Sequence, residues 1–276
     1  MICRRSFFSS SALLRAGEST THFRTRAAQQ EVLYKHPLPH PVFSAAELTA
    51  VQVKHTPPVD WLATAAYAAI RCVRVGFDVA SGYAFGRTTE TKVLRRILFL
   101  ETVAGVPGAC AATLRHLRSL RRVQRDGGWI VSLLEESENE RMHMLMFSQL
   151  KTPGPLFRAG VLVAQGVFWN AFFMAYIVSP RFCHLLVAYL EEEAVKTYTS
   201  VLAHMDAGDL PAWSKASAPP IARRYYNLPD DATMRDVILN VRADEAWHRD
   251  ANHLFATLRP DDMNPMVLDN KSEKKP

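Results

Sequence analysis

Two short motifs in the sequence place a glutamate three residues before a histidine. The first is Glu140 with His143, and the second is Glu245 with His248. Residues three apart lie on one face of a helix, so each motif can direct a carboxylate and an imidazole toward the same point. Either motif alone indicates little, because glutamate and histidine are frequent enough in this chain for one such pair to arise by chance.

Two further glutamates turn these motifs into a pattern. Glu101 is a lone acid in the apolar run 97–104, and Glu191 continues the apolar stripe of a later helix. Helical bundles that hold two iron ions use one glutamate from each of two helices and a Glu-x-x-His pair from each of the other two. The order of the residues along the chain repeats that scheme. We therefore predict a centre of two iron ions per chain with these six ligands: Glu101, Glu140, His143, Glu191, Glu245 and His248.

This set of residues suits iron that cycles between its ferrous and ferric states. Such iron needs hard, anionic oxygen ligands, and one imidazole per ion leaves positions open for O₂. Asn139 and Asp244 each precede a motif glutamate, so we expect them to form hydrogen bonds with ligating groups. Tyr198 lies seven residues after Glu191, on the same helix face. The pattern alone leaves open whether Tyr198 relays electrons or protons, or only packs in the core.

The elements that must position these residues are helices. Periodicity predicts an all-α chain with about six of them, at 60–83, 91–122, 129–150, 156–178, 182–205 and 231–258. A ferritin-like four-helix bundle with a di-iron core, plus two further long helices, would bring the ligands together. We divide the chain into a leader at 1–30, a proline-rich extended arm at 31–58, the bundle at 59–258 and a C-terminal tail at 259–276.

The composition indicates where the protein is sent in the cell and argues against two other classes of function. Residues 1–30 are rich in arginine and serine and contain one acid, Glu18, which is typical of an organelle transit peptide, the alternative being a disordered basic tail. The net charge is +6, but no basic block is interleaved with aromatic residues, so we expect no nucleic-acid partner. The four cysteines lie far apart, which excludes a zinc ribbon and argues against a disulfide framework.

The fourth predicted helix contains an uncharged stretch at 159–178, which is long enough to span a membrane. A single crossing would place Glu140 and Glu191 on opposite sides of the bilayer, where they could not share a metal pair. We therefore predict a monotopic membrane protein, with the first helix adding a second apolar face. The alternative is a buried core helix in a soluble protein.

Four blocks of the sequence resemble the signature blocks of the alternative oxidases, the cyanide-insensitive ubiquinol oxidases of mitochondria. They are Leu100–Val103, Asn139–His143, Leu190–Ala194 and Arg242–Arg249. The blocks occur in the order of the family, and the similarity extends from about Asp60 to His253.

The resemblance implies a fold, a reaction and a site. The family oxidises ubiquinol and reduces O₂ to water at a di-iron centre without pumping protons. The same six ligands carry over, Tyr198 becomes a redox-active tyrosine, and the quinol cavity maps onto Arg74, Asp78, Arg96, Leu100, Leu190, Glu193 and Thr197. Family members are homodimers on the matrix face of the mitochondrial inner membrane, and they contact its lipid through the first and fourth helices.

This sequence also departs from the family pattern. Its amino-terminal region offers only Cys3, within the predicted leader, so control by an intersubunit disulfide is not expected. Trp247 and the pair Tyr225 and Tyr226 differ from the residues expected at their positions. Three alternatives remain: a plastid-type quinol oxidase, a di-iron hydroxylase of quinone biosynthesis, and a ferritin-like iron-binding protein without turnover. An uncharged fourth helix argues against a soluble iron store.

Overall fold

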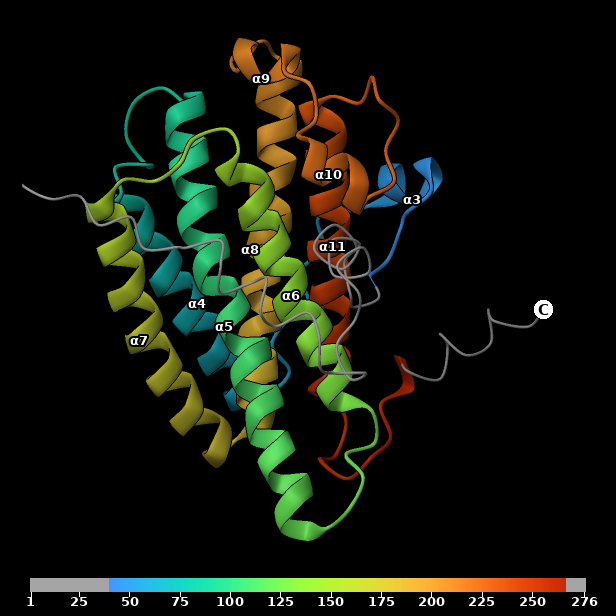
Figure 1. The fold of residues 1–276 in the computed structure, drawn as a ribbon. Helices are drawn as coiled ribbons and strands as arrows, with labels where there is room; N and C mark the ends of the chain where they lie inside the picture. Colours follow the sequence, from blue (N-terminus) through green and yellow to red (C-terminus); the bar gives the residue numbers. More distant parts are fainter. Residues whose placement is uncertain (1–39, 267–276) are drawn as a thin grey trace, which may run out of the picture. The chain divides into compact units, whose positions relative to one another are not determined.

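The chain forms a bundle of long helices (Figure 1). The computed structural model describes residues 40–266, and in that range the backbone is helical, with one isolated β-bridge between Ser217 and Thr233. The long helices are α4 (Trp61–Ala80), α5 (Glu90–Arg122), α6 (Trp129–Ser148), α7 (Pro155–Val178), α8 (Pro180–Asp206) and α11 (Met234–Phe255). The predicted all-α class and its six long helices are confirmed. The predicted leader lies outside the described residues.

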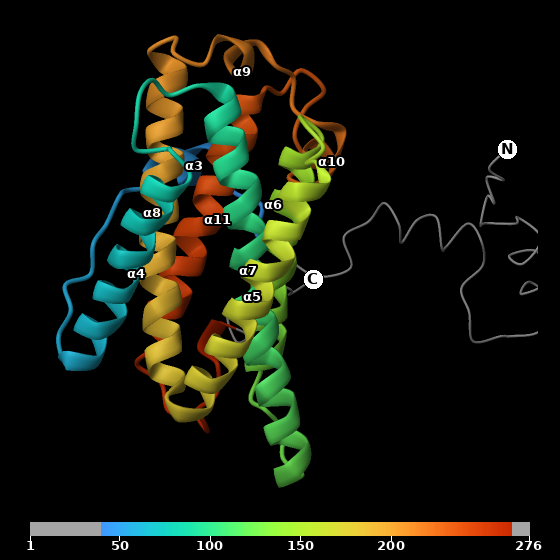
Figure 2. The ribbon, with the colours of Figure 1, turned by 90° about the vertical axis from the view of Figure 1, so that its left-hand side faces the viewer.

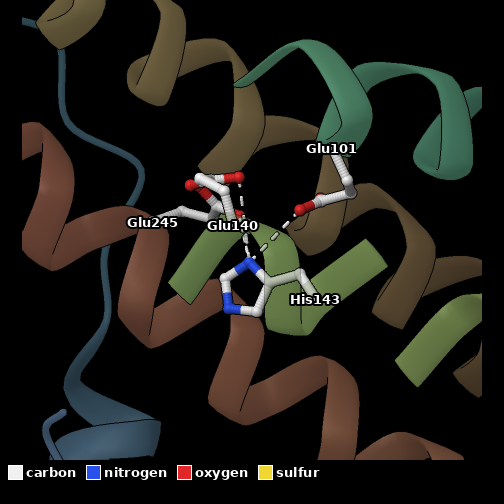
Figure 3. Close-up of side chains that lie close together, drawn as sticks. All are labelled: Glu101, Glu140, His143 and Glu245. Carbon is white, nitrogen blue, oxygen red and sulfur yellow. Dashed lines mark ion pairs between the residues drawn. The ribbon is translucent and has the colours of Figure 1, made fainter. Parts of the chain in front are cut away.

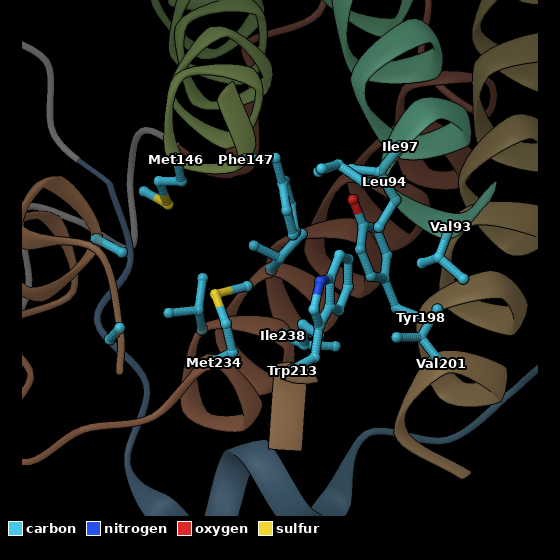
Figure 4. Close-up of a cluster of buried hydrophobic side chains, with 14 of the residues drawn as sticks. Val93, Leu94, Ile97, Met146, Phe147, Tyr198, Val201, Trp213, Met234 and Ile238 are labelled. Atoms are coloured by element: carbon cyan, nitrogen blue, oxygen red, sulfur yellow. The ribbon is translucent and has the colours of Figure 1, made fainter. Parts of the chain in front are cut away.

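Helices α5, α6, α8 and α11 form the four-helix core. Helix α4 packs against α8, and α7 packs against both α5 and α8, as the two views of Figures 1 and 2 show. One hydrophobic cluster fills the end of the bundle nearest α9 (Pro211–Lys215) and α10 (Pro220–Tyr225), and Figure 4 draws part of it. Its labelled members are Val93, Leu94, Ile97, Met146, Phe147, Tyr198, Val201, Trp213, Met234 and Ile238.

Short polar residues fix where the helices begin. Asp60 caps α4, because its side chain accepts a hydrogen bond of 2.8 Å from the backbone nitrogen of Ala63. Ser179 ends α7 and also caps α8, whose first residue is Pro180. Proline suits this first position because it lacks the N–H that would have no partner there. The tight corner at Ser179 makes α7 and α8 neighbours that run in opposite directions (Figure 2).

Helices α5 and α6 approach closely at two glycines. A Cβ atom on Gly108 would lie 2.5 Å from the carbonyl oxygen of Leu133, which is closer than atoms can pack. One turn earlier, the Ser137 hydroxyl donates a 2.7 Å hydrogen bond to the carbonyl of Gly105. Because Gly105 and Gly108 have no side chains, α5 and α6 can lie close enough together to bring Glu101 near Glu140.

Three short helices lie where the sequence predicted none. Within the predicted extended arm, α3 (Ala45–Ala50) forms because Ser44 and Glu47 make a reciprocal capping box. Helices α9 and α10 lie in the stretch between α8 and α11, and each begins with a proline at its first turn. Each is too short to show helical periodicity in the sequence, which is why the pattern did not predict them.

The arm continues along the bundle and is tied to α8 and α11. Arg242 donates a 2.7 Å hydrogen bond to the carbonyl of Leu48, and Arg249 donates one of 3.0 Å to the carbonyl of Gln52. His55 then donates to the carboxylate of Glu192 at 2.7 Å. We call residues 40–59 the strap, because side chains of the bundle hold its backbone at successive points.

The start of the predicted C-terminal tail is part of the fold. Asn264 is fully buried, and its backbone nitrogen donates to the carbonyl of Gly127 at 2.9 Å. Trp129 donates to the carbonyl of Asp262 at 2.8 Å. The segment 259–266 therefore covers the start of α6. The remainder, 267–276, lies outside the described residues.

Two helices in the described range are long and apolar enough to cross a membrane, namely α5 and α7. They differ in burial: half of the apolar window of α5 is inside the protein, against 11% for α7. Helix α5 is thus a core helix. Helix α7 buries Phe172 and Tyr176 and exposes large apolar side chains along its length, which are Leu156, Leu162, Val163, Val167, Met174, Ile177 and Val178.

Candidate metal centre

The structure brings the six predicted ligands together in the middle of the four-helix core. Helix α5 supplies Glu101, α6 supplies Glu140 and His143, α8 supplies Glu191, and α11 supplies Glu245 and His248. All six side chains are buried, and none is more than 6% exposed. Figure 3 shows how Glu101, Glu140 and Glu245 converge on the ring of His143.

These residues form two overlapping groups of four. One group is Glu101, Glu140, His143 and Glu245, and the other is Glu140, Glu191, Glu245 and His248. In each group the potential ligand atoms all lie within 4.8 Å of one another. Glu140 and Glu245 belong to both groups, so the arrangement offers two adjacent metal positions that share two carboxylates.

Many ligand atoms in the cluster lack a hydrogen bond. The Nδ1 atom of His143 lies 3.2 Å from Glu101 and 3.3 Å from Glu245, but neither approach has hydrogen-bond geometry. The Nδ1 atom of His248 is 2.9 Å from Glu140, again without suitable geometry. Both carboxylate oxygens of Glu140 also have no hydrogen-bond partner. Buried polar atoms are rarely left unpaired, so this pattern fits atoms that bind metal ions.

The charges lead to the same conclusion. Burial raises the pKa of Glu140 and Glu191 well above the usual range, and the neighbouring carboxylates raise them further. Burial also acts to raise the pKa of Glu245, but His143 and His248 outweigh it and the pKa is lowered. Four buried carboxylates beside two imidazoles need added positive charge, which divalent cations would supply. The donor set contains oxygen and imidazole nitrogen without thiolate, which suits iron or manganese in a bundle.

A second layer of hydrogen bonds orients His143. Its Nε2 donates to the carboxylate of Asp244 at 2.9 Å, so its Nδ1 faces the cluster. The same oxygen of Asp244 accepts from Asn139 at 3.0 Å and from the Tyr226 hydroxyl at 2.7 Å. Asn139 also donates to the hydroxyl of Tyr225 at 2.8 Å. The structure therefore places Asp244 directly behind the predicted ligand His143, and Asn139 one step further away.

Tyr198 reaches the cluster from α8. Its hydroxyl donates to Glu101 Oε1, and its ring is 2% exposed and stacks on Phe147. Burial raises the pKa of Tyr198 well above its usual value, and the carboxylate of Glu101 raises it further. The tyrosine is thus both a core residue and one hydrogen bond away from a predicted ligand.

Five of the seven residues predicted for quinol binding form one polar network between α4, α5 and α8. Arg74 contacts Asp78 at 2.8 Å, Glu193 at 3.2 Å and Thr197 at 3.1 Å, and Arg96 pairs with Asp78. The Arg74 and Asp78 pair is therefore part of a network rather than an isolated surface pair. The other two, Leu100 and Leu190, are half-buried on α5 and α8, each one residue before a predicted ligand.

Several residues of these networks were not predicted from the sequence. Arg71 and Lys196 contact Glu193 at 3.1 Å and 2.7 Å. In the sequence, nothing distinguishes these two cations from ordinary surface residues. Tyr225 and Tyr226 support Asp244 and Asn139 from outside the predicted helices. The sequence contains the tyrosine pair but gives no signal of its partners, since these lie far away along the chain.

A cavity of about 520 Å³ opens beside Glu101, between α5, α6 and α7. Its lining is mostly apolar and includes Gly105, Met144, Leu162 and Trp169. None of the seven residues predicted for quinol binding lines this cavity. This cavity therefore reaches the cluster at Glu101 from the α7 side.

The other histidines of the described residues lie outside both groups of candidate ligands. His184 is buried and hydrogen-bonded, His204 pairs with Asp209, and His116 is exposed. His253 donates to Glu192 at 3.0 Å on the strap side of α8.

Comparison with known proteins gives a consistent result. The family model described as "Alternative oxidase" matches residues 43–257. A mitochondrial alternative oxidase of Emericella nidulans is 47% identical over 249 residues, which cover 86% of this chain and 70% of the relative. That of Venturia inaequalis is 48% identical, covering 82% and 68%. That of Trypanosoma brucei brucei is 46% identical, covering 84% and 71%.

Proposed function

The chain belongs to the alternative oxidase family, and from this premise we propose that it oxidises ubiquinol with O₂ at a pair of iron ions. The observation that carries the proposal is the pair of overlapping ligand groups that share Glu140 and Glu245. Two bound irons would take electrons from the quinol and pass them to O₂. Two ubiquinol molecules supply the four electrons and four protons that convert one O₂ into two waters.

The network on the α4 side would bind the quinol head group. Arg74 and Thr197 offer donors to its oxygens, and Glu193 and Asp78 offer carboxylates that can accept its protons. Arg96 is 3% exposed and holds Asp78 in place while its guanidinium lies over the ring of Tyr83. Leu100 and Leu190 add apolar surface for the ring.

We propose that Tyr198 carries an electron and a proton between the quinol and the centre. Its neighbour Thr197 contacts Arg74 in the quinol network, while its own hydroxyl donates to Glu101. The tyrosine therefore stands between the two networks. A phenol that has a carboxylate as its hydrogen-bond acceptor can give up its proton as it is oxidised.

We further propose that the protein is bound to the matrix face of the mitochondrial inner membrane. The relatives are named mitochondrial, and residues 1–30 have a transit-peptide composition. Helix α7 exposes its apolar face beside the bundle, and α4 exposes Trp61, Val73, Val75 and Val79. Because α7 runs alongside α5 and α8 (Figures 1 and 2), a full crossing would carry their polar residues into hydrocarbon. Insertion into one leaflet avoids this cost.

A homodimer is also part of the proposal. Helices α5 and α6 expose the apolar side chains of Leu117, Leu120, Val131 and Leu134, which a second copy of the chain could cover. Sedimentation of the detergent-solubilised protein should therefore give a mass of two chains.

The decisive experiment measures metal and turnover together. Protein purified in detergent should contain about two irons per chain and consume O₂ when given ubiquinol, with cyanide present. Glu140→Ala should lose both iron and activity. Tyr198→Phe should keep its iron and lose turnover, while the control Tyr67→Phe, on α4 away from the cluster, should keep both.

Each contrary result has a definite meaning. Zinc in place of iron would overturn the oxidase proposal. Iron without quinol-dependent O₂ uptake would instead favour a ferritin-like iron-binding protein. Full activity in Tyr198→Phe would show that the tyrosine serves only the packing of the core.

A further inference from the structure

Glu136 is a fifth buried carboxylate close to the metal centre. It lies on α6, one helical turn before Glu140, and is 7% exposed. It belongs to neither group of candidate ligands. Among the residues that the structure describes, no lysine or arginine forms an ion pair with it, and burial raises its pKa. A buried acid without such a partner destabilises a fold, so its presence calls for another explanation.

A series of hydrogen bonds from three other helices ends on this carboxylate. Asn252 on α11 donates to Glu136 at 2.8 Å and also to the backbone carbonyl of the ligand His248 at 3.0 Å. The side chain of Asn252 contacts His184 on α8 at 3.0 Å, and His184 contacts the Tyr176 hydroxyl on α7 at 3.2 Å. Every member of the series is buried.

The direction of these hydrogen bonds is fixed by Asn252. Its amide nitrogen donates to two oxygens, so its carbonyl oxygen must accept from Nδ1 of His184. Nε2 of His184 then accepts from the hydroxyl of Tyr176. Burial lowers the pKa of His184 to about 4, so the ring is neutral at pH 7 and has one proton to donate. Each donor thus points toward Glu136, which is the final acceptor.

We propose that Glu136 is a positioning residue for the His248 side of the metal centre. Through Asn252 it holds the α11 backbone at His248, and its negative charge favours cations bound beside that ligand. It would serve His248 as Asp244 serves His143, although through the backbone rather than the ring. The inference rests on the proposed function, because it requires that the centre binds metal.

The charge, rather than the hydrogen bond, is what requires a glutamate here. A glutamine would offer Asn252 an equivalent acceptor oxygen without placing a charge in the core. In the metal-free chain, burial makes the carboxylate unfavourable, and the Asn252 hydrogen bond and the nearby His248 compensate this only in part, because the pKa is still raised. Bound cations would supply the remaining compensation. A purely structural role would make Glu136 stabilise the metal-free protein. If Glu136 instead acts on the metal, it should destabilise the metal-free protein and strengthen metal binding.

The test uses Glu136→Gln in the full chain, in detergent, with metal removed by a chelator. We expect the midpoint temperature of the metal-free variant to rise, while its affinity for Co²⁺, followed by the visible absorption of the bound ion, falls about 10–100-fold. The matched control is Glu135→Gln, the adjacent half-buried acid, whose pKa burial also raises. It should bind Co²⁺ as the unmodified chain does.

Two results would overturn the inference. One is unchanged Co²⁺ affinity in Glu136→Gln, and the other is a lower midpoint temperature or failure to fold without metal. A second variant adds a further check. Tyr176 lies at the far end of the hydrogen-bond series, so Tyr176→Phe should weaken Co²⁺ binding less than Glu136→Gln does. If the unmodified chain does not bind two Co²⁺ ions, the proposed function fails, which is a separate outcome.

Discussion

The two halves of the metal centre are built from the same kinds of ligand but are held by different means. The α5–α6 half carries Glu101, Glu140 and His143, and its helices are spaced by backbone contact at Gly108. The α8–α11 half carries Glu191, Glu245 and His248, and polar groups surround it. There the strap is bound through Glu192, and Asn252 joins α11 to α6.

Each half also orients ligands of the other half. Asp244 on α11 holds His143 on α6, and Tyr198 on α8 donates to Glu101 on α5. The two kinds of contact therefore do different things: one fixes the distance between helices, and the other fixes the direction of side chains. Close packing sets the distance between helices, since it tolerates little change in volume. Polar contacts set the direction of individual side chains, since they depend on angle.

The largest effect should come from the close contact between α5 and α6. Gly108→Ala would place a methyl group 2.5 Å from the Leu133 carbonyl and force the helices apart. We expect a loss of more than about 3 kcal/mol in unfolding free energy, or failure to fold, measured by thermal unfolding in detergent. The control is Gly76→Ala on α4, where a Cβ meets nothing within 4 Å, which should gain about 0.5–1 kcal/mol. Equal stability of the two variants would refute the packing argument.

A smaller effect should follow from loosening an orienting contact between the halves. Asp244→Asn removes the negative charge that holds Nε2 of His143, so we expect metal affinity to fall about 10–100-fold. Asp250→Asn is the matched control on the same helix, because Asp250 is 62% exposed and belongs to neither group of candidate ligands. Titration of the metal-free chains with Co²⁺ measures both. If Asp250→Asn weakened binding as much, the effect would be one of overall charge.

The smallest effect concerns the strap. Burial acts to raise the pKa of Glu192, but hydrogen bonds from His253, His55 and the Thr56 backbone lower it below 4.5. The ionised form therefore stabilises the fold above about pH 4.5, and this contribution is lost as the pH falls through the lowered pKa. Glu192→Gln should lose about 1–2 kcal/mol at pH 7 and depend less on pH in the acid range.

Chemical unfolding at several pH values measures this prediction. Asp206→Asn provides the comparison, because the Asp206 and Arg235 pair also joins α8 to α11 but is 58% and 45% exposed. Its loss should change stability by less than about 0.5 kcal/mol. A larger effect in Asp206→Asn than in Glu192→Gln would mean that the strap contributes little to this half.

Much of this architecture could be predicted from the sequence because it depends on local order. Spacing within a helix determines which residues share a face, so Glu101 and Glu191 could be joined to the two motifs. Capping residues and prolines set the helix ends, as Asp60 and Pro180 show. The family resemblance then indicated the quinol network, which periodicity alone would not have assembled.

The remainder depends on contacts between distant segments. Glu191, Glu192 and Glu193 are successive residues that meet three different environments: the metal cluster, the strap and the arginines of α4. Helix geometry predicts that they point in different directions but not what each one meets. Glu136 and Asn252 are 116 positions apart, and no sequence pattern joins them. The strap likewise binds in part through the backbone carbonyls of Leu48 and Gln52, which carry no signal in the side-chain pattern.

The sharing of Glu140 and Glu245 between the two ligand groups has a consequence for how the centre fills. The first ion to arrive must order both carboxylates, whereas the second finds them already in place. Occupancy should thus be cooperative, and at limiting metal the population should divide into empty and fully loaded molecules, with few that hold a single ion. Loss should follow the same rule, so that removal of one ion releases its neighbour.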